Sequence, residues 1–339
     1  MKWIRRLTRI ELALIYLVIL AGSVVRMTGS GMGCPDWPKC FGYLIPPTER
    51  AQLEWQPQHT YQKGQIIIVD ESLRVAQSDF STTSSYSESN WAPYTKHDYA
   101  LFNPAHTWTE YINRLAGALA GIPMFLLVII SLWHIRKNWK WLLLSCIGLF
   151  LLGFEAWLGK LVVDGNLIPG SITIHMMGAL AIIAVLCLLL HSLRKKEGSL
   201  PVTSTYKWGV AAALIFTLIQ IVLGTQVREQ IDIANKENLE RIYWISQLDW
   251  SFYVHRSFSI LILILNLWLW QQHRKMGNIL PEMNWVMALI GLEIIFGIIL
   301  SYWALPKFAQ PLHLLLGTGL FGFQFYALLK SGQKKLQTL

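Results

Sequence analysis

Three histidines near the starts of apolar segments carry side chains that can bind a metal: His175, His255 and His313. Each lies one or two residues into its apolar run, and we expect all three at the outer face of a membrane. Ionisable side chains at this depth are rare and usually functional. A lone histidine near a helix end is more often structural, but three at one depth favour ligation. Because neutral imidazoles from two helices can take both axial positions of a haem iron, we interpret His255 and His313 as such a pair.

Zinc and copper are the alternatives for this pair. Zinc would need a third or fourth ligand, and we place no Cys, Asp or Glu at the depth of His255 and His313. Copper is disfavoured because no methionines cluster there. The pair therefore favours haem over either metal ion.

The N-terminal half of the chain offers a different set of ligands. His175 corresponds to His313, but Asn113 stands where His255 would predict a histidine. Asparagine is a poor iron ligand, so this half has one strong axial ligand and an open or weakly held opposite side. A permanent redox haem needs two ligands, whereas a reacting haem needs access to one face. The asymmetry predicts a fixed haem in the C-terminal half and a transformed haem in the N-terminal half.

Four arginines are expected at the same outer edge: Arg26, Arg114, Arg228 and Arg256. The two propionates of a haem are well matched by guanidinium groups. Ordinary interfacial snorkelling is the alternative. Their positions in the repeat described below favour a shared ligand.

Three glutamates are candidates for proton chemistry. Glu110 precedes Asn113 by three residues, so the two share a helix face. Glu110 can form a simple pair with Arg114 one turn away, or it can lie beside a substrate and move protons or stabilise a developing cation. Glu155 and Glu293 fall inside apolar segments, where each is either hydrogen-bonded within the bundle or carries protons.

Two cysteines lie close together in a turn-rich loop. Cys34 and Cys40 are separated by two prolines and preceded by a run of glycines, which favours a turn that brings them together. In an oxidising compartment they can form a disulfide. Metal binding is the alternative, and it is disfavoured because no histidine is adjacent. Cys146 and Cys187 lie in apolar helices, where we expect them to be inert.

The amino-acid composition predicts that membrane-spanning helices position these residues. Apolar residues make up 53% of the 339 residues and charged residues only 14%, with a mean hydropathy of +0.39. Soluble domains have roughly 25% charged residues, so a soluble enzyme and a disordered chain are both excluded. A bilayer-spanning helix needs about 20 mostly apolar residues. The sequence predicts an all-α integral membrane protein with eight spans, at about 10–27, 112–133, 141–162, 172–192, 208–227, 251–271, 284–303 and 311–329.

Charge sets the expected orientation. More than half of the 29 Lys and Arg residues fall in the short segments that are inside if the N-terminus is cytoplasmic,. We therefore expect both termini in the cytoplasm and two larger loops, 28–109 and 228–250, outside. Residues 65–69 of the first loop can form a short strand, and we do not expect this loop to be a separate domain. The first span is read as a retained helix rather than a signal peptide, in a bacterial plasma membrane.

The eight spans resemble two sets of four, arranged as parallel repeats. An N-terminal half, 1–200, and a C-terminal half, 201–339, would each form a four-helix bundle. Chance similarity among apolar helices is the alternative, but three pairs of segments match in the same order. The pairs are 22–26 with 224–228, 110–114 with 252–256, and 174–178 with 312–317.

These motifs together resemble the haem A synthase family over nearly all eight spans. The most specific stretch is GSVVRMTGSGMGCPDWPKC at 22–40, and the other matching pieces are EYINR at 110–114, IHMMG at 174–178, VHR at 254–256 and PLH at 311–313. The family oxidises the C8 methyl of haem O to a formyl group through an alcohol, giving haem A for terminal oxidases. Its expected partners are haem O synthase, oxidase assembly factors and a membrane electron acceptor.

The resemblance also implies roles for individual residues. It implies a haem b held by His255 and His313, and haem O bound in the N-terminal half with His175 as a ligand. Glu110 matches the reactive-site glutamate of the family. Cys34 and Cys40 match its outer-loop cysteine pair, which is structural or redox-linked.

Two features depart from the family pattern. Asn113 stands where family members commonly have histidine. His106, seven residues earlier, is the alternative ligand, but we expect it to lie outside the helix that carries Asn113. The loop 28–109 is longer than expected, so its extra residues can cover the site or contact a partner.

The rival interpretations are a cytochrome b-type membrane electron carrier, a haem or metabolite transporter, and a structural membrane subunit. Asn113 counts against the carrier, and ligands clustered at one membrane edge count against the transporter.

Overall fold

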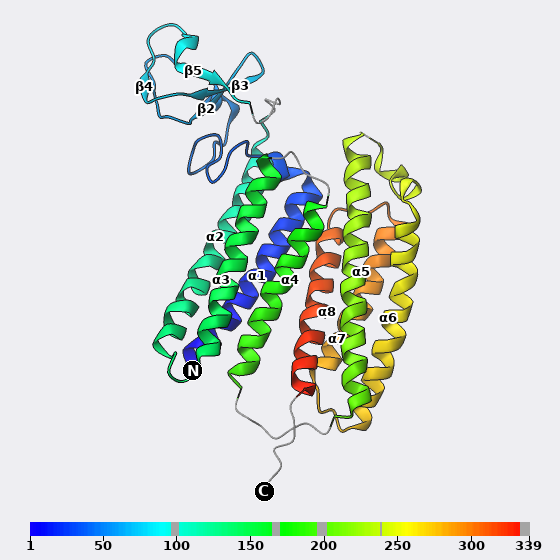
Figure 1. The fold of residues 1–339 in the computed structure, drawn as a ribbon. Helices are drawn as coiled ribbons and strands as arrows, with labels where there is room; N and C mark the ends of the chain where they lie inside the picture. Colours follow the sequence, from blue (N-terminus) through cyan, green and yellow to red (C-terminus); the bar gives the residue numbers. More distant parts are fainter. Residues whose placement is uncertain (96–101, 165–169, 195–201, 238, 333–339) are drawn as a thin grey trace. The chain divides into compact units, whose positions relative to one another are not determined.

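The computed structural model describes residues 1–95, 102–164, 170–194, 202–237 and 239–332, and in this part of the chain eight helices are long and apolar enough to cross a membrane (Figure 1). The predicted multi-pass, all-α fold is confirmed. The helices are α1 Lys2–Thr28, α2 Pro104–Trp133, α3 Trp139–Asp164, α4 Ser171–Ser192, α5 Ser204–Lys236, α6 Trp250–Lys275, α7 Glu282–Tyr302 and α8 Ala309–Ser331.

Several helices extend beyond the apolar spans expected from the sequence. Helix α1 begins at Lys2, α2 begins at Pro104, and α5 continues to Lys236. Hydropathy marks only the apolar part of a helix, whereas backbone hydrogen bonding continues into polar residues outside the bilayer core. His106 therefore lies inside α2, and the expectation that it lies outside this helix was wrong.

The same extension changes the depth of the three histidines. Helices α4, α6 and α8 begin at Ser171, Trp250 and Ala309, so each histidine lies about one helical turn inside its helix. The expected depth of one or two residues was too shallow.

The chain divides into two compact units. The first comprises 1–20, 119–155 and 169–339. Within it, α5, α6, α7 and α8 pack in a closed ring, each against two neighbours (Figure 1). Their shared core is aliphatic and includes Val210, Ala213, Ile262, Leu269, Val286, Ile290, Leu320 and Ala327.

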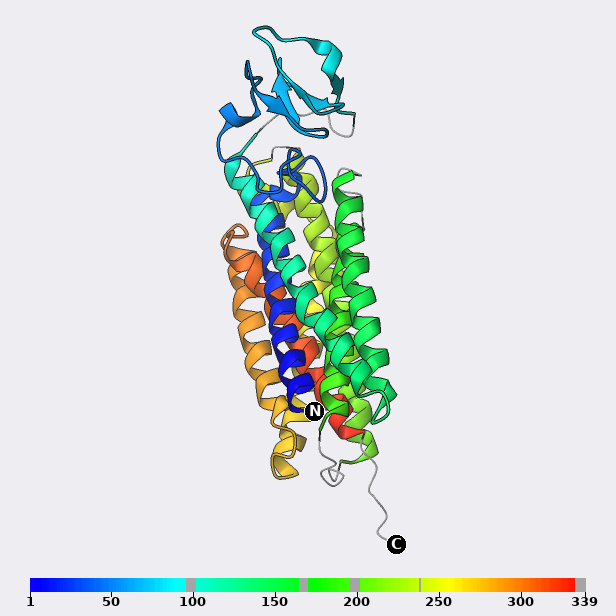
Figure 2. The same ribbon diagram turned by 90° about the vertical axis from the view of Figure 1, so that its left-hand side faces the viewer.

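A second core of the same unit joins parts of the N-terminal helices. Helix α4 also packs against α5 and α8. Buried side chains of this core are Ile4, Ile15, Ile19, Ala120, Met124, Leu127, Trp141, Leu180, Ile183 and Leu186. The N-terminal end of α1 and the C-terminal end of α8 lie at the same end of this unit in both views (Figures 1 and 2).

The second unit comprises 21–118 and 156–168, and it contains the long loop. Strands β2 Ile66–Val69, β3 Ser72–Ala76 and β5 Trp91–Pro93 form an antiparallel sheet in the order β2-β3-β5, and β1 Thr60–Tyr61 pairs with β4 Phe80–Ser81. The strand expected at 65–69 is thus confirmed as β2. Short 3-10 helices flank these strands at Ser30–Met32, Arg50–Leu53 and Glu88–Asn90, and two more follow α5 at Arg241–Tyr243 and Ile245–Gln247.

The loop has a small apolar core of its own. Ile66, Ile68 and Leu73 are buried against the two loop cysteines, while Ile67 on the opposite face is buried with an aromatic group. This alternation is the two-residue period of a strand that is covered on both faces. The hairpin between β2 and β3 turns through Asp70 and Glu71, which both have positive φ. A two-residue type I′ hairpin turn requires positive φ at both of its central residues.

Candidate functional site

The two histidines of the C-terminal half face each other across the helical ring. His255 on α6 and His313 on α8 have ring centroids 6.3 Å apart, with planes 85° apart. An imidazole nitrogen lies roughly 1 Å from its ring centroid and binds a metal at about 2 Å, so two imidazoles on opposite sides of one metal have centroids roughly 6 Å apart. The separation would therefore allow both imidazoles to hold one metal ion.

Glycines leave room around this pair. A Cβ at Gly224 of α5 would lie 3.1 Å from Cε1 of His255, and a Cβ at Gly297 of α7 would lie 3.9 Å from Cε1 of His313. The side-chain amide of Gln220 donates to the carbonyl of His255 at 2.9 Å. Nδ1 of His255 and Nδ1 of His313 are both buried without a hydrogen bond in the described part of the chain. A buried nitrogen of this kind leaves its ring able to take up a ligand or a charged partner.

A carboxylate supports His313. Oε2 of Glu293, on α7, lies 2.6 Å from Nδ1 of His313. The expectation that no acidic residue shares the depth of the pair was therefore wrong, because α7 packs against α8 and brings Glu293 beside His313. Contact at Nδ1 leaves Nε2 of His313 for a metal, which is the usual arrangement around metal-binding histidines.

The N-terminal half contains a matching pair. Nδ1 of His175, on α4, is hydrogen-bonded to Oε2 of Glu155, on α3, at 2.6 Å. Glu155 precedes His175 by 20 residues, and Glu293 precedes His313 by the same separation. This regular spacing was the signal in the sequence that could have identified the two glutamates as histidine partners.

Asn113 occupies a position comparable to that of His255. A Cβ at Gly22 of α1 would lie 3.7 Å from Oδ1 of Asn113 in α2, as a Cβ at Gly224 would approach His255. Oδ1 of Asn113 is buried and has no hydrogen-bond partner among the described residues. The glycine-facing position in the second helix of each half thus holds an amide in one half and an imidazole in the other.

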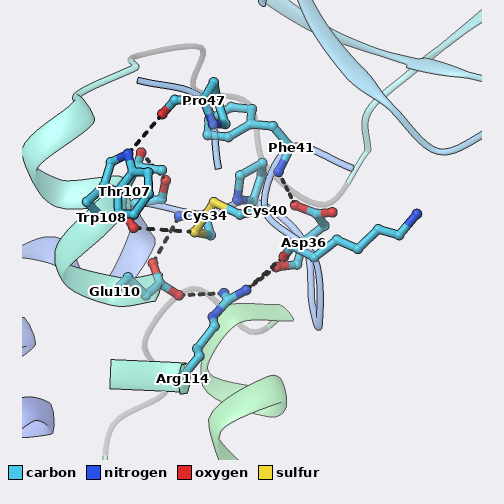
Figure 3. Close-up of a disulfide and its surroundings, with 12 residues drawn as sticks. Cys34, Asp36, Cys40, Phe41, Pro47, Thr107, Trp108, Glu110 and Arg114 are labelled. Atoms are coloured by element: carbon cyan, nitrogen blue, oxygen red, sulfur yellow. Dashed lines mark hydrogen bonds and ion pairs between the residues drawn. A yellow bond between two sulfur atoms is a disulfide. The ribbon is translucent and has the colours of Figure 1, made fainter. Parts of the chain in front are cut away.

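Cys34 and Cys40 form a disulfide, as the sequence favoured (Figure 3). The loop that they close is held against the first turns of α2. Oε2 of Glu110 accepts a hydrogen bond from the backbone N–H of Cys34 at 2.9 Å, and Thr107 Oγ1 donates to the carbonyl of Gly33 at 2.7 Å. A Cβ at Gly33 would lie 2.6 Å from the carbonyl of His106, so glycine is required for this close approach.

Arg114 links the same loop to Glu110. Its guanidinium is 2.5 Å from Oε1 of Glu110 and donates to the carbonyls of Asp36 and Lys39 at 2.7 and 2.9 Å (Figure 3). The pair expected from the one-turn spacing is therefore present, and Glu110 is almost fully buried. Both carboxylate oxygens of Glu110 are engaged, which holds this side chain in one orientation.

Asp36 organises the inside of the disulfide loop. Its carboxylate accepts hydrogen bonds from the backbone N–H groups of Phe41 and Gly42 at 2.6 and 2.9 Å. Burial raises the pKa of Asp36, while these hydrogen bonds and the nearby Arg114 act to lower it. The carboxylate therefore relies on its backbone donors to remain buried in this turn.

The other candidate arginines lie in different surroundings. Arg228 is inside α5, where it contacts Gln310 of α8 and lies 2.6 Å from Asp232. Arg256 follows His255 and is exposed, and Arg26 lies in the last turn of α1. Arg228 is thus joined to α8 near His313.

A family model and several curated proteins are similar to this chain, and they agree on one family. A family model described as cytochrome oxidase assembly protein matches residues 5–82 and 70–325. Three similar curated proteins are named haem A synthase. The one from Shewanella oneidensis is 30% identical over 225 residues, covering 64% of this chain and 54% of that protein. The one from Rhodopseudomonas palustris strain HaA2 is 25% identical over 325 residues (87% of this chain, 80% of that protein), and the one from Rhizobium johnstonii is 24% identical over 222 residues (63% and 53%).

The matched parts span about half of the Shewanella and Rhizobium proteins and about four fifths of the Rhodopseudomonas protein. The family model covers most of the described helices, from α1 into α8. On this match, together with the eight apolar helices, the chain belongs to the cytochrome oxidase assembly protein family.

Proposed function

We propose that this chain is a haem A synthase, a membrane oxidoreductase that converts haem O into haem A by oxidising its C8 methyl group to a formyl group. The observation that carries the proposal is the pair of facing imidazoles of His255 and His313, at a separation suited to one iron. In the N-terminal half, His175 corresponds to His313, and each contacts a glutamate. Asn113 stands at the position that corresponds to His255. One half is thus suited to a permanent haem and the other to a haem that reacts.

His255 and His313 are the proposed ligands of a haem b. When bound, this haem b supplies one-electron transfer chemistry. His313 is held by Glu293 at Nδ1, and Gln220 holds the backbone of His255. Arg228 and Arg256 are the proposed propionate partners, and Arg228 is the better placed because it contacts Gln310 on the helix that carries His313.

Haem O is the proposed substrate of the N-terminal half, with His175 as an iron ligand. Oxidation of a methyl to a formyl group releases protons and electrons in equal number and takes up an oxygen atom. We propose that Glu110 accepts a proton or stabilises positive charge that develops at the methyl carbon. Arg26 and Arg114 are the proposed propionate partners here. Arg114 also pairs with Glu110.

The proposed location is a bacterial plasma membrane with both termini cytoplasmic. The concentration of Lys and Arg in the short connecting segments supports this orientation,. The ends of α1 and α8, which lie at one end of the helical unit, agree with it. The proposed partners are haem O synthase, oxidase assembly factors and a membrane electron acceptor.

The function is tested by expressing the chain in a host that makes haem O but not haem A. Haems are extracted from the purified protein and separated by reversed-phase chromatography with mass detection. We expect haem b together with haem A or the alcohol intermediate. Two unchanged haem b molecules per chain would instead indicate a cytochrome b-type electron carrier and overturn the proposal.

A further inference from the structure

Two glutamates in the membrane-spanning helices make the same contact in the two halves of the chain. Glu155 and Glu293 each approach Nδ1 of a histidine at 2.6 Å through Oε2. Each glutamate lies on the third helix of its half, and each histidine lies on the fourth. The two halves thus share the contacting atoms, the distance and the 20-residue spacing between glutamate and histidine.

The surroundings show that the histidine is the important partner of each carboxylate. The side chains of Glu155 and Glu293 are only 15% and 17% exposed. The second oxygen of each, Oε1, is buried and has no hydrogen-bond partner among the described residues. A carboxylate with little exposure is costly unless it is paired. The contact with the imidazole is thus what compensates for burying each carboxylate.

Glycines make space for both carboxylates. A Cβ at Gly178, one turn after His175, would overlap Oε1 of Glu155. A Cβ at Gly317, one turn after His313, would lie 3.6 Å from Oε1 of Glu293, which is an ordinary contact. The Glu155 carboxylate therefore depends on the absence of a side chain at 178, whereas the Glu293 carboxylate tolerates a methyl group at 317.

We propose that Glu155 and Glu293 are positioning residues for the two haem-binding histidines. Each carboxylate accepts the Nδ1–H of its imidazole, which selects the tautomer whose Nε2 is free to bind iron and fixes the direction of the ring. The anionic acceptor also makes the imidazole a stronger donor, which favours ferric over ferrous iron. This inference rests on the haem ligation proposed above and adds to it the residues that hold the ligands.

The first test is the midpoint potential of haem b in Glu293→Gln, with Glu155→Gln as the matched control. Glutamine keeps the size and a hydrogen-bond acceptor but removes the charge. We expect Glu293→Gln to retain the six-coordinate low-spin spectrum and to shift the haem b potential to a more positive value. Glu155→Gln should leave that potential unchanged. In Glu293→Ala, which also loses the acceptor, haem b affinity should fall by roughly 10- to 100-fold.

A second test displaces a carboxylate without altering its chemistry. Gly178→Ala should push Glu155 away from His175 and reduce haem O retention in the same way as Glu155→Ala, while haem b stays bound. Gly317→Ala is the matched control, and it should leave both haems in place. Loss of haem b as well in Gly178→Ala would indicate a general disruption of the fold and would contradict this expectation.

The outcomes separate this inference from the function on which it rests. If His313→Ala loses haem b but Glu293→Gln leaves the potential unchanged, the positioning role is wrong and the ligation stands. If Glu155→Gln shifts the haem b potential as much as Glu293→Gln does, the assignment of one glutamate to each half is wrong. If His313→Ala keeps an unaltered haem b, the ligation fails, and this inference fails with it.

Discussion

At the residue scale, the main feature is that most candidate side chains are held by a second group. Glu293 contacts His313, Glu155 contacts His175, and Glu110 is held between Arg114 and the backbone of Cys34. Supporting contacts of this kind restrict a functional side chain to one orientation. The buried Oδ1 of Asn113 and the buried Nδ1 of His255 differ, because neither atom has a hydrogen-bond partner in the described part of the chain.

Replacement of Glu110 tests its proposed chemical role. In Glu110→Gln, the amide oxygen can still accept from the N–H of Cys34, but the negative charge is lost. General acid–base groups contribute roughly 10²- to 10⁴-fold to rates, so we expect haem A formation to fall by that factor while the haem b spectrum is unchanged. The measurement is the ratio of haem A to haem O in extracts, with the exposed Glu54→Gln as control. Haem A output equal to that of the control would exclude a chemical role for Glu110.

At the element scale, the disulfide loop and the start of α2 behave as one structural element. The loop is closed by Cys34 and Cys40 and is fastened to α2 by Thr107, Glu110 and Arg114 (Figure 3). The close approach at Gly33 brings its backbone against that of α2. A substitution within the loop should therefore alter the surroundings of Glu110 without replacing Glu110 itself.

Substitution of Gly33 tests this coupling. In Gly33→Ala the added methyl group would meet backbone atoms of α2 that cannot swing aside, and overpacking of this kind costs about 1–3 kcal/mol. Gly117→Ala, in open space on α2, is the matched control and should be neutral or stabilising by up to about 1 kcal/mol,. Thermal unfolding in detergent measures both variants. Equal stabilities would show that the loop is not fastened to α2 as described.

At the scale of the whole molecule, the sequence predicted more of the fold than of the side-chain contacts. Hydropathy located all eight spans, because each is a long run of apolar residues, and the stretch 65–69 indicated β2. Helix ends were less predictable, since α2 and α5 continue into polar sequence. The contact of Glu293 with His313 was missed because it depends on how α7 and α8 are rotated about their axes, and neither apolar helix shows this clearly in its sequence pattern.

The two halves are proposed to be copies that hold different haems. The C-terminal ring of four helices carries two facing imidazoles, and the N-terminal half carries one supported imidazole and an asparagine. On this proposal, the difference would allow one half to serve electron transfer and the other substrate oxidation. The central claim is therefore that each half can lose its haem without the other.

The most direct test is to identify the haems that remain in purified His313→Ala and His175→Ala, each supplied with haem O. Haems are extracted from equal amounts of protein and quantified by chromatography with mass detection. We predict that His313→Ala loses haem b and keeps haem O, whereas His175→Ala keeps haem b and loses haem O and its oxidised products. Loss of the same haem in both variants would contradict the assignment of separate haems to the two halves.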